Sequence, residues 1–140
     1  MFQYIKRILV VDEANELKYS IIRHLRRNGF DMDSANGNEE AQRKIIVSRK
    51  NGSRFDLLIR IAQVHDPIRI EFIEWIHQHA DIATIVISGL GDTGWVRAIL
   101  KPEKDEHAPN PLTPENLMSA IYSIESKLHT LQNLRSSSSV

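Results

Sequence analysis

A short apolar run near the amino terminus, from Ile8 to Val11, ends directly in two acids, Asp12 and Glu13. An unbroken run of β-branched residues and leucine predicts a strand that is buried on both faces of a parallel sheet. Apolar residues then recur at helical spacing, at Leu17, Ile21, Ile22 and Leu25. Gly29 can supply the left-handed backbone that ends such a helix. The opening of the chain therefore predicts a strand followed by a helix.

The same alternation continues along the chain. Further strands are expected from Phe30 to Ala35, from Phe55 to Ile61 and from Thr84 to Ile87. Helices between them are indicated by spaced apolar residues, namely Ala41, Ile45, Ile46, Phe72, Ile73, Ile76, Trp95, Val96, Ile99 and Leu100. Thr113 and Pro114 are a typical N-cap and first-turn proline for a last helix.

Strands that alternate with helices of this size predict a doubly wound α/β domain with right-handed crossovers. We expect the flavodoxin-like arrangement, a parallel five-stranded sheet with strand order 2-1-3-4-5. The fifth strand is expected to be short, distorted or missing, because the stretch from Glu103 to Pro109 is charged and has few strand-forming residues. In this fold the functional cleft lies at the carboxyl ends of strands 1 and 3. Asp12, Glu13 and Ile61 would meet there.

The composition excludes several classes of function. The 140 residues fit one globular domain, which we place at 1–134, with 135–140 as a flexible tail or the start of a linker. Eighteen basic and eighteen acidic residues cancel, so no net charge draws the domain to nucleic acid or to a membrane. The sequence has no cysteine, which excludes thiolate metal sites and cysteine nucleophiles. No apolar run is long enough to span a membrane, so the expected location is cytoplasmic.

The segment KRILVVDE, from Lys6 to Glu13, resembles the opening of a CheY-like response-regulator receiver domain, and the resemblance extends to about Leu128. In that family an acidic pair after strand 1 holds Mg²⁺, and Asp12 and Glu13 match the pair. The segment PIRIEFIEWI resembles the MDGxEFL opening of the family's third helix, and Glu71 sets the register. Counting back from Glu71 places the family's phosphoacceptor aspartate at Ile61.

The same resemblance assigns three other positions. Asp56 matches the aspartate that opens strand 3 in the family, and Ser88 matches the serine or threonine that contacts the phosphoryl group. The segment PLTPENLMSAI resembles the stretch after the family's conserved lysine, which places Asn110 at the lysine position. The aromatic residue expected shortly before that lysine is also absent, because the local sequence is His107, Ala108 and Pro109.

These departures imply a degenerate receiver. Phosphorylation of an aspartate needs a carboxylate nucleophile, a hard cation and a lysine that opposes the growing negative charge. Ile61 supplies no nucleophile and Asn110 supplies no charge, so the domain is not expected to be an enzyme. No cofactor is expected beyond weak Mg²⁺ at Asp12 and Glu13, which lack a third carboxylate. An equal alternative is that these two acids only cap the next helix.

The resulting prediction is a pseudo-receiver of two-component signalling and phosphorelay pathways, acting by contact on a histidine kinase or an output domain. One alternative is a Mg²⁺-dependent phosphoacceptor that uses Asp56 or Asp66. Another is a small-molecule site in the vacated cleft, which the absence of a glycine-rich loop after strand 1 disfavours. Arg60 neighbours Ile61 but should point to the opposite face of the strand, so it is not assigned to the cleft.

The last helix suggests a further contact. Leu117, Ile121, Ile124, Leu128 and Leu131 follow a heptad spacing that outruns the usual last helix of a receiver. Packing on the sheet would explain the first three of these residues. Leu128 and Leu131 are harder to explain in that way, and they favour a homodimer that forms through the last helix.

Overall fold

The computed structural model describes residues 2–62, 70–89, 93–109 and 112–138. The strands are β1 (Arg7–Val11), β2 (Asp31–Ala35), β3 (Leu57–Ile61), β4 (Ala83–Ser88) and β5 (Glu106–Pro109). The helices are α1 (Glu16–Arg27), α2 (Asn38–Lys50), α3 (Ile70–Trp75), α4 (Thr93–Ile99) and α5 (Pro114–Ser138), and a π-helical turn η1 (Ile76–Ala80) continues α3. Strand and helix therefore alternate as the sequence predicts.

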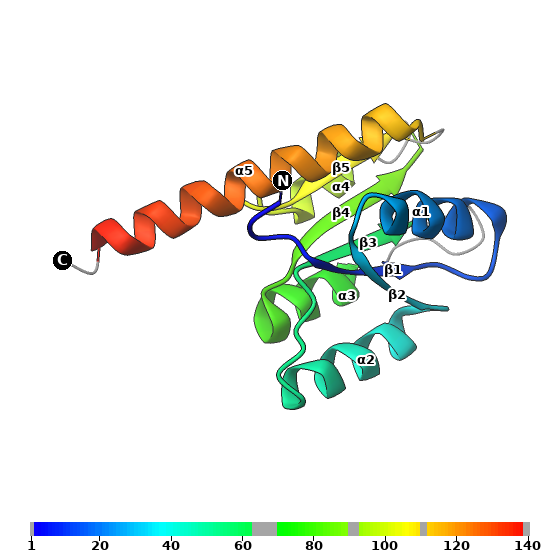
Figure 1. The fold of residues 1–140 in the computed structure, drawn as a ribbon, viewed down its shortest axis with the longest axis horizontal. Helices are drawn as coiled ribbons and strands as arrows, with labels where there is room; N and C mark the ends of the chain where they lie inside the picture. Colours follow the sequence, from blue (N-terminus) through cyan, green and yellow to red (C-terminus); the bar gives the residue numbers. More distant parts are fainter. Residues whose placement is uncertain (1, 63–69, 90–92, 110–111, 139–140) are drawn as a thin grey trace.

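The five strands form one parallel sheet in the order β2-β1-β3-β4-β5, which confirms the predicted topology. Strand β2, in which polar residues alternate with apolar ones, is an outermost strand of this sheet. Helices α1 and α5 lie on one face, and α2 and α3 lie on the other (Figure 1). The carboxyl ends of all the strands point to the same edge of the sheet, which we call the carboxyl edge.

Two apolar clusters, one on each face, make the core. Side chains alternate between the faces along a strand, so Ile8 and Val10 join the cluster under α1 and α5 while Leu9 and Val11 join the other. Every residue of β3 and of β4 is buried. The continuous apolar runs in the sequence therefore mark strands that are covered on both faces.

The helix ends follow the predicted local chemistry. Gly29, just after α1, has φ of 92°, a left-handed value that glycine adopts without strain. The Thr113 hydroxyl accepts a hydrogen bond from the Asn116 amide at 3.0 Å, which confirms Thr113 as the N-cap of α5. Local signals in the sequence thus locate the end of α1 and the start of α5.

Strand β5 is short but regular, and it pairs with β4 from Ile85 and Glu106 onward. A buried acid, Asp105, fixes its start: the carboxylate accepts hydrogen bonds at 2.9 Å from the amides of Thr84 and Lys101. The same carboxylate lies 3.0 Å from Nε2 of His77. Charged residues made a strand unlikely in the sequence from Glu103 to Pro109, yet the carboxylate of Asp105 helps to hold β5 in place.

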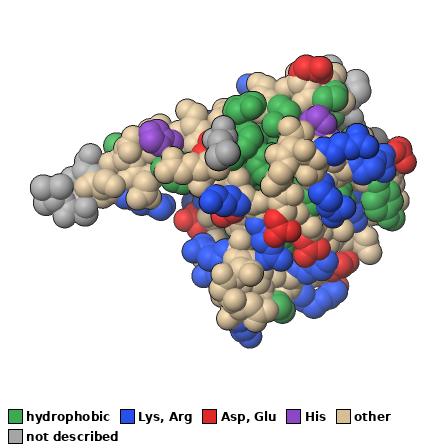
Figure 2. Space-filling model, viewed as in Figure 1, with side chains coloured by type: hydrophobic (Ala, Val, Ile, Leu, Met, Phe, Trp, Pro, Cys, Tyr) green, Lys and Arg blue, Asp and Glu red, His purple; other side chains and the backbone are tan. Residues whose placement is uncertain are grey.

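The last helix is longer than the sheet it packs on. Leu117, Ile121 and Ile124 are buried in the core, as expected for a helix that covers a sheet. Leu128 packs against the edge of the same cluster and is half-buried, whereas Leu134 is 61% exposed. The last turns project beyond the body of the domain (Figures 1 and 2). We call residues 128–138 the α5 extension.

The predicted division at residue 134 stays a prediction, although regular helix continues through Ser138.

Within the described ranges, no helix is both long enough and apolar enough to cross a membrane.

We expect Asp105→Ala to lower the free energy of unfolding by about 3 kcal/mol, because two backbone amides would lose their acceptor. Glu103→Ala is the matched control, since Glu103 is exposed in the same turn and its loss should cost less than about 0.5 kcal/mol. Chemical denaturation followed by circular dichroism measures both values. Equal denaturation midpoints for the two variants would show that Asp105 does not anchor β5.

Candidate functional site

Three of the predicted site residues come together at the carboxyl edge. Asp12 follows β1, Ile61 ends β3 and Ser88 ends β4. The strand register places the ends of β3 and β4 side by side, because Ile61 pairs with Ile87, the residue before Ser88. Asn110 and Asp66, which the sequence analysis also singled out, lie outside the described residues.

Asp12 is fully buried, and its carboxylate is engaged by the turn after β1. It accepts hydrogen bonds from the Glu13 amide at 2.9 Å and from Nδ2 of Asn15 at 2.6 Å. The side-chain oxygen of Asn15 in turn accepts from the Lys18 amide at 2.9 Å, as the N-cap of α1. The N-cap of α1 is therefore Asn15 and not either of the two acids, and Asp12 acts on the cap indirectly, by orienting Asn15.

A buried lysine, which the sequence analysis missed, lies beneath Asp12. Lys18 is 2% exposed, and its Nζ donates to the carbonyl oxygens of Asp12 at 2.8 Å and Ala35 at 3.2 Å, and to Oδ1 of Asn36 at 3.0 Å. Desolvation lowers the pKa of the Lys18 ammonium, and the nearby carboxylates of Glu40 and Asp12 oppose that shift. The lysine thus ties the carboxyl ends of β1 and β2 together. Its position three residues before Ile21, on the apolar stripe of α1, was the available signal.

The apolar residue at the expected acceptor position belongs to the core. Ile61 has no exposed surface and packs in the cluster under α1 and α5. It offers neither a nucleophile nor a metal ligand. Glu13, by contrast, is exposed.

The two acids after β1, Asp12 and Glu13, are the residues at which Mg²⁺ was expected to bind weakly if at all. Mg²⁺ requires near-octahedral oxygen coordination. In the parts of the chain that the structure describes, no three or more histidine or acidic side chains are grouped to hold a metal. Asp12 already accepts two hydrogen bonds, and Ile61 contributes no oxygen. The residues present therefore do not fit a Mg²⁺ site.

The hydroxyl of Ser88 has a side-chain partner on the neighbouring strand. Its Oγ lies 2.7 Å from Nε2 of His107 in β5, and Ser88 itself is fully buried. The strand register places Ser88 opposite Pro109. In the sequence, His107 marked only the absence of the expected aromatic residue. The sequence pattern gave no sign that the imidazole of His107 would reach Ser88.

Arg60 lies on the opposite face of β3 from Ile61, as predicted. It is 1% exposed, and Nε donates to Oδ1 of Asn38 at the start of α2 at 2.9 Å. Its guanidinium also donates to the carbonyl of Ile61. Nothing in the sequence pattern indicated that this arginine would be buried.

Asp56 lies at the opposite end of β3. It immediately precedes Leu57, and its Oδ2 accepts from the amides of Lys6 at 3.0 Å and Arg7 at 2.9 Å. These hydrogen bonds hold the start of β3 against the start of β1. Asp12 and Asp56 are thus separated by the full length of the strands.

No protein-family model matches the chain, and no curated protein matches it. Solved structures are similar to it. A CheY-like response regulator receiver domain protein from Methanospirillum hungatei JF-1 is 20% identical, with a TM-score of 0.71 over 90% of this chain and 98% of that chain. A receiver domain protein from Clostridium thermocellum is also 20% identical, with a TM-score of 0.70 over 91% and 99%. A receiver protein from Pseudomonas putida is 21% identical, with a TM-score of 0.66 over 85% and 97%. The chain therefore has the receiver fold.

We expect Mg²⁺ at millimolar concentration to leave the melting temperature nearly unchanged, because a ligand below its dissociation constant stabilises by well under about 1 kcal/mol. Differential scanning fluorimetry measures the shift, with Asp12→Asn and Glu13→Gln variants as controls. A rise of several degrees in the native chain that either variant abolishes would mean that the acidic pair binds the cation.

Proposed function

We propose that this chain is a receiver-fold module of two-component signalling that acts by contact with a protein partner, without phosphoryl transfer. The observation that carries the proposal is Ile61, a fully buried aliphatic residue at the carboxyl end of β3. The resemblance places the phosphoacceptor at this position. Receiver domains are in general signalling modules rather than enzymes, and the proposed partner is a histidine kinase or an output domain.

The surroundings of Ile61 support the same proposal. An acyl phosphate needs a cation that neutralises the transferring oxygens. In this chain the nearby cation is the ammonium of Lys18, and it already donates hydrogen bonds to the carbonyl oxygens of Asp12 and Ala35 and to the side chain of Asn36. The Asp12 carboxylate orients Asn15. The role of Asp12 in this turn therefore explains the acid without a bound metal.

The alternative acceptor Asp56 has less support from the geometry. Its carboxylate is bound to two amides at the amino end of β3, away from Asp12 and Ser88. A phosphoryl group there would compete with those hydrogen bonds. Asp66 lies outside the described residues and stays the other alternative.

Incubation with a small phosphodonor and Mg²⁺ is expected to leave the intact mass of the protein unchanged, because Ile61 cannot form an acyl phosphate. An active receiver domain in the same reaction is the positive control. A hydroxylamine-labile gain of one phosphate, mapped by peptide mass spectrometry to Asp56 or Asp66, would refute the proposal. Asp56→Asn and Asp66→Asn variants would then identify the acceptor.

Self-association through the last helix stays a prediction, and the structure supports a narrower version of it. Leu128 and Leu131 are half-buried on their own domain, so changing both to lysine would disturb the fold as well as any interface. Leu134 is 61% exposed and is the better residue to test. A weak homodimer that buries Leu134 from each chain is the expected form.

We expect Leu134→Lys to weaken dimerisation by at least about ten-fold, since burying a leucine contributes about 1.5 kcal/mol or more. The matched control is Val47→Lys, because Val47 is 54% exposed on a different helix. Sedimentation equilibrium at high micromolar concentration measures both. A native chain that remains strictly monomeric there would contradict the prediction.

A further inference from the structure

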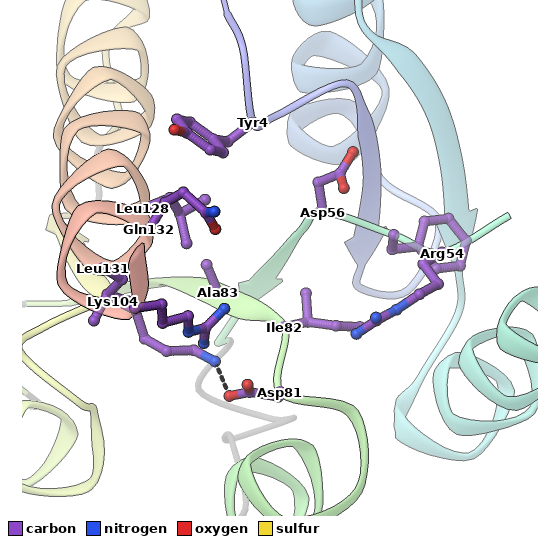
Figure 3. Close-up of a pocket in the computed structure, with 12 residues that line it drawn as sticks. Tyr4, Arg54, Asp56, Asp81, Ile82, Ala83, Lys104, Leu128, Leu131 and Gln132 are labelled. Carbon is purple, nitrogen blue, oxygen red and sulfur yellow. Dashed lines mark hydrogen bonds and ion pairs between the residues drawn. The ribbon is translucent and has the colours of Figure 1, made fainter. Parts of the chain in front are cut away.

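A groove lies beneath the α5 extension, at the end of the sheet opposite to Asp12 and Ile61. Its volume is about 280 Å³. We call it the amino-edge groove, and its principal lining residues are Tyr4, Arg54, Ile82, Leu128, Leu131 and Arg135. Figure 3 shows that Leu128 and Leu131 come from the helix on one side, while Arg54 reaches in from the segment before β3 on the other.

The apolar part of the groove is continuous with the core. Leu128 packs against the cluster under α1 and α5, and Leu131 extends the same helix face beyond the sheet. Ile82 and Ala83, which are almost completely buried, form the floor between the helix and Arg54 (Figure 3). An apolar side chain placed here would cover the half-buried leucines.

The acids of the groove already have partners. Asp56 accepts from two backbone amides, and Asp81 forms an ion pair with Lys104 (Figure 3). Partial burial alone would raise the pKa of Asp81. The hydrogen bond and charge of Lys104, together with the charges of Lys101 and Arg135, hold the pKa below its usual value. Asp81 is thus paired with one cation and stabilised in its charged form by two more.

Arg54 supplies positive charge that the domain does not neutralise. It is exposed, and its side chain forms no hydrogen bond or ion pair among the described residues. The groove also carries Lys104 and Arg135, so its cations outnumber its acids, Asp56 and Asp81. An occupant with negative charge is therefore favoured.

Charge also argues against a second copy of the α5 extension as the occupant. The α5 extension, residues 128–138, has no acid, and its one lysine or arginine is Arg135. A second extension in the groove would bring Arg135 towards Arg54 and Lys104, and like charges in contact weaken binding. Contact through Leu134 does not meet this obstacle, because Leu134 is exposed and does not line the groove.

We propose that the amino-edge groove binds a segment of a partner protein that presents leucine-like side chains next to glutamate or aspartate. The apolar side chains would lie on Leu128, Leu131 and Ile82. A carboxylate would meet the guanidinium of Arg54, which can donate two parallel hydrogen bonds. A short amphipathic helix in a groove is a common way for such a segment to bind. The proposal goes beyond the absence of phosphoryl transfer and does not depend on it.

The experiment uses the full chain and two labelled amphipathic peptides of about 15 residues, long enough to form a helix. One has leucines along one face with glutamates beside them, and the other has lysine in place of each glutamate. Fluorescence anisotropy should show binding of the glutamate peptide only, and added salt should weaken it. Amide NMR signals of Ile82, Leu128 and Leu131 should shift on binding.

Arg54→Glu should weaken binding of the glutamate peptide by at least about ten-fold. Arg26→Glu is the matched control, because it makes the same charge change at an exposed position of α1 and should bind as the native chain does. Arg54→Gln, a milder change, should give an intermediate loss. Circular dichroism verifies that each variant is folded.

Three results would overturn the proposal. The first is equal binding, or no binding, of the two peptides. The second is the same loss of affinity in Arg54→Glu and Arg26→Glu, which would indicate attraction by overall charge alone. The third is a concentration-dependent dimer that Arg54→Glu disperses in sedimentation, which would place a second copy of this chain in the groove.

Discussion

Burial of the central strands on both faces is the constraint that shapes this domain. Every position of β3 and β4 is buried, so no side chain in the middle of these strands can reach a ligand or a partner. Polar chemistry is left to the two edges of the sheet, where strands end and loops begin. The chemical character of each edge therefore decides what the fold can do, and here the two edges differ sharply.

Two buried cations hold the carboxyl edge in its present form. A buried charge is costly unless hydrogen bonds satisfy it. Lys18 binds oxygens at the ends of β1 and β2, and Arg60 joins β3 to Asn38 at the start of α2. These are permanent covalent parts of the chain, unlike an exchangeable metal. An edge held in this way does not need an incoming cation to bring its strand ends together.

Sequence reasoning recovered the features that depend on local pattern. Apolar periodicity and turn residues predicted the order of the elements, Gly29 and the cap at Thr113, because each signal lies within a few neighbouring residues. The sheet topology was predicted from the fold class that this alternation indicates. It also predicted that Arg60 would face away from Ile61, since side chains alternate along a strand.

The features that sequence reasoning missed depend on partners far apart in the chain. Asp105 reads as a loop acid until the amide of Thr84 is seen to bind it, 21 residues away. Lys18 reads as a solvated lysine until the fold brings the Ala35 carbonyl to it. A charged residue in the sequence does not show whether its partner is water or a buried backbone group, so β5 was expected to be weaker than it is.

Strand β5 connects the two edges through its contacts with α5. Lys127 of α5 donates to the Asp105 carbonyl at 2.7 Å and forms an ion pair with Glu106 at 2.9 Å. One residue further along β5, His107 meets Ser88 at the carboxyl edge. The α5 extension begins directly after Lys127. A partner that binds the extension would therefore act on a helix that is tied to β5 one residue away, and β5 is tied in turn to Ser88 at the carboxyl edge. These contacts, joined by the backbone of β5, give the domain a physical connection between the α5 extension and the carboxyl edge.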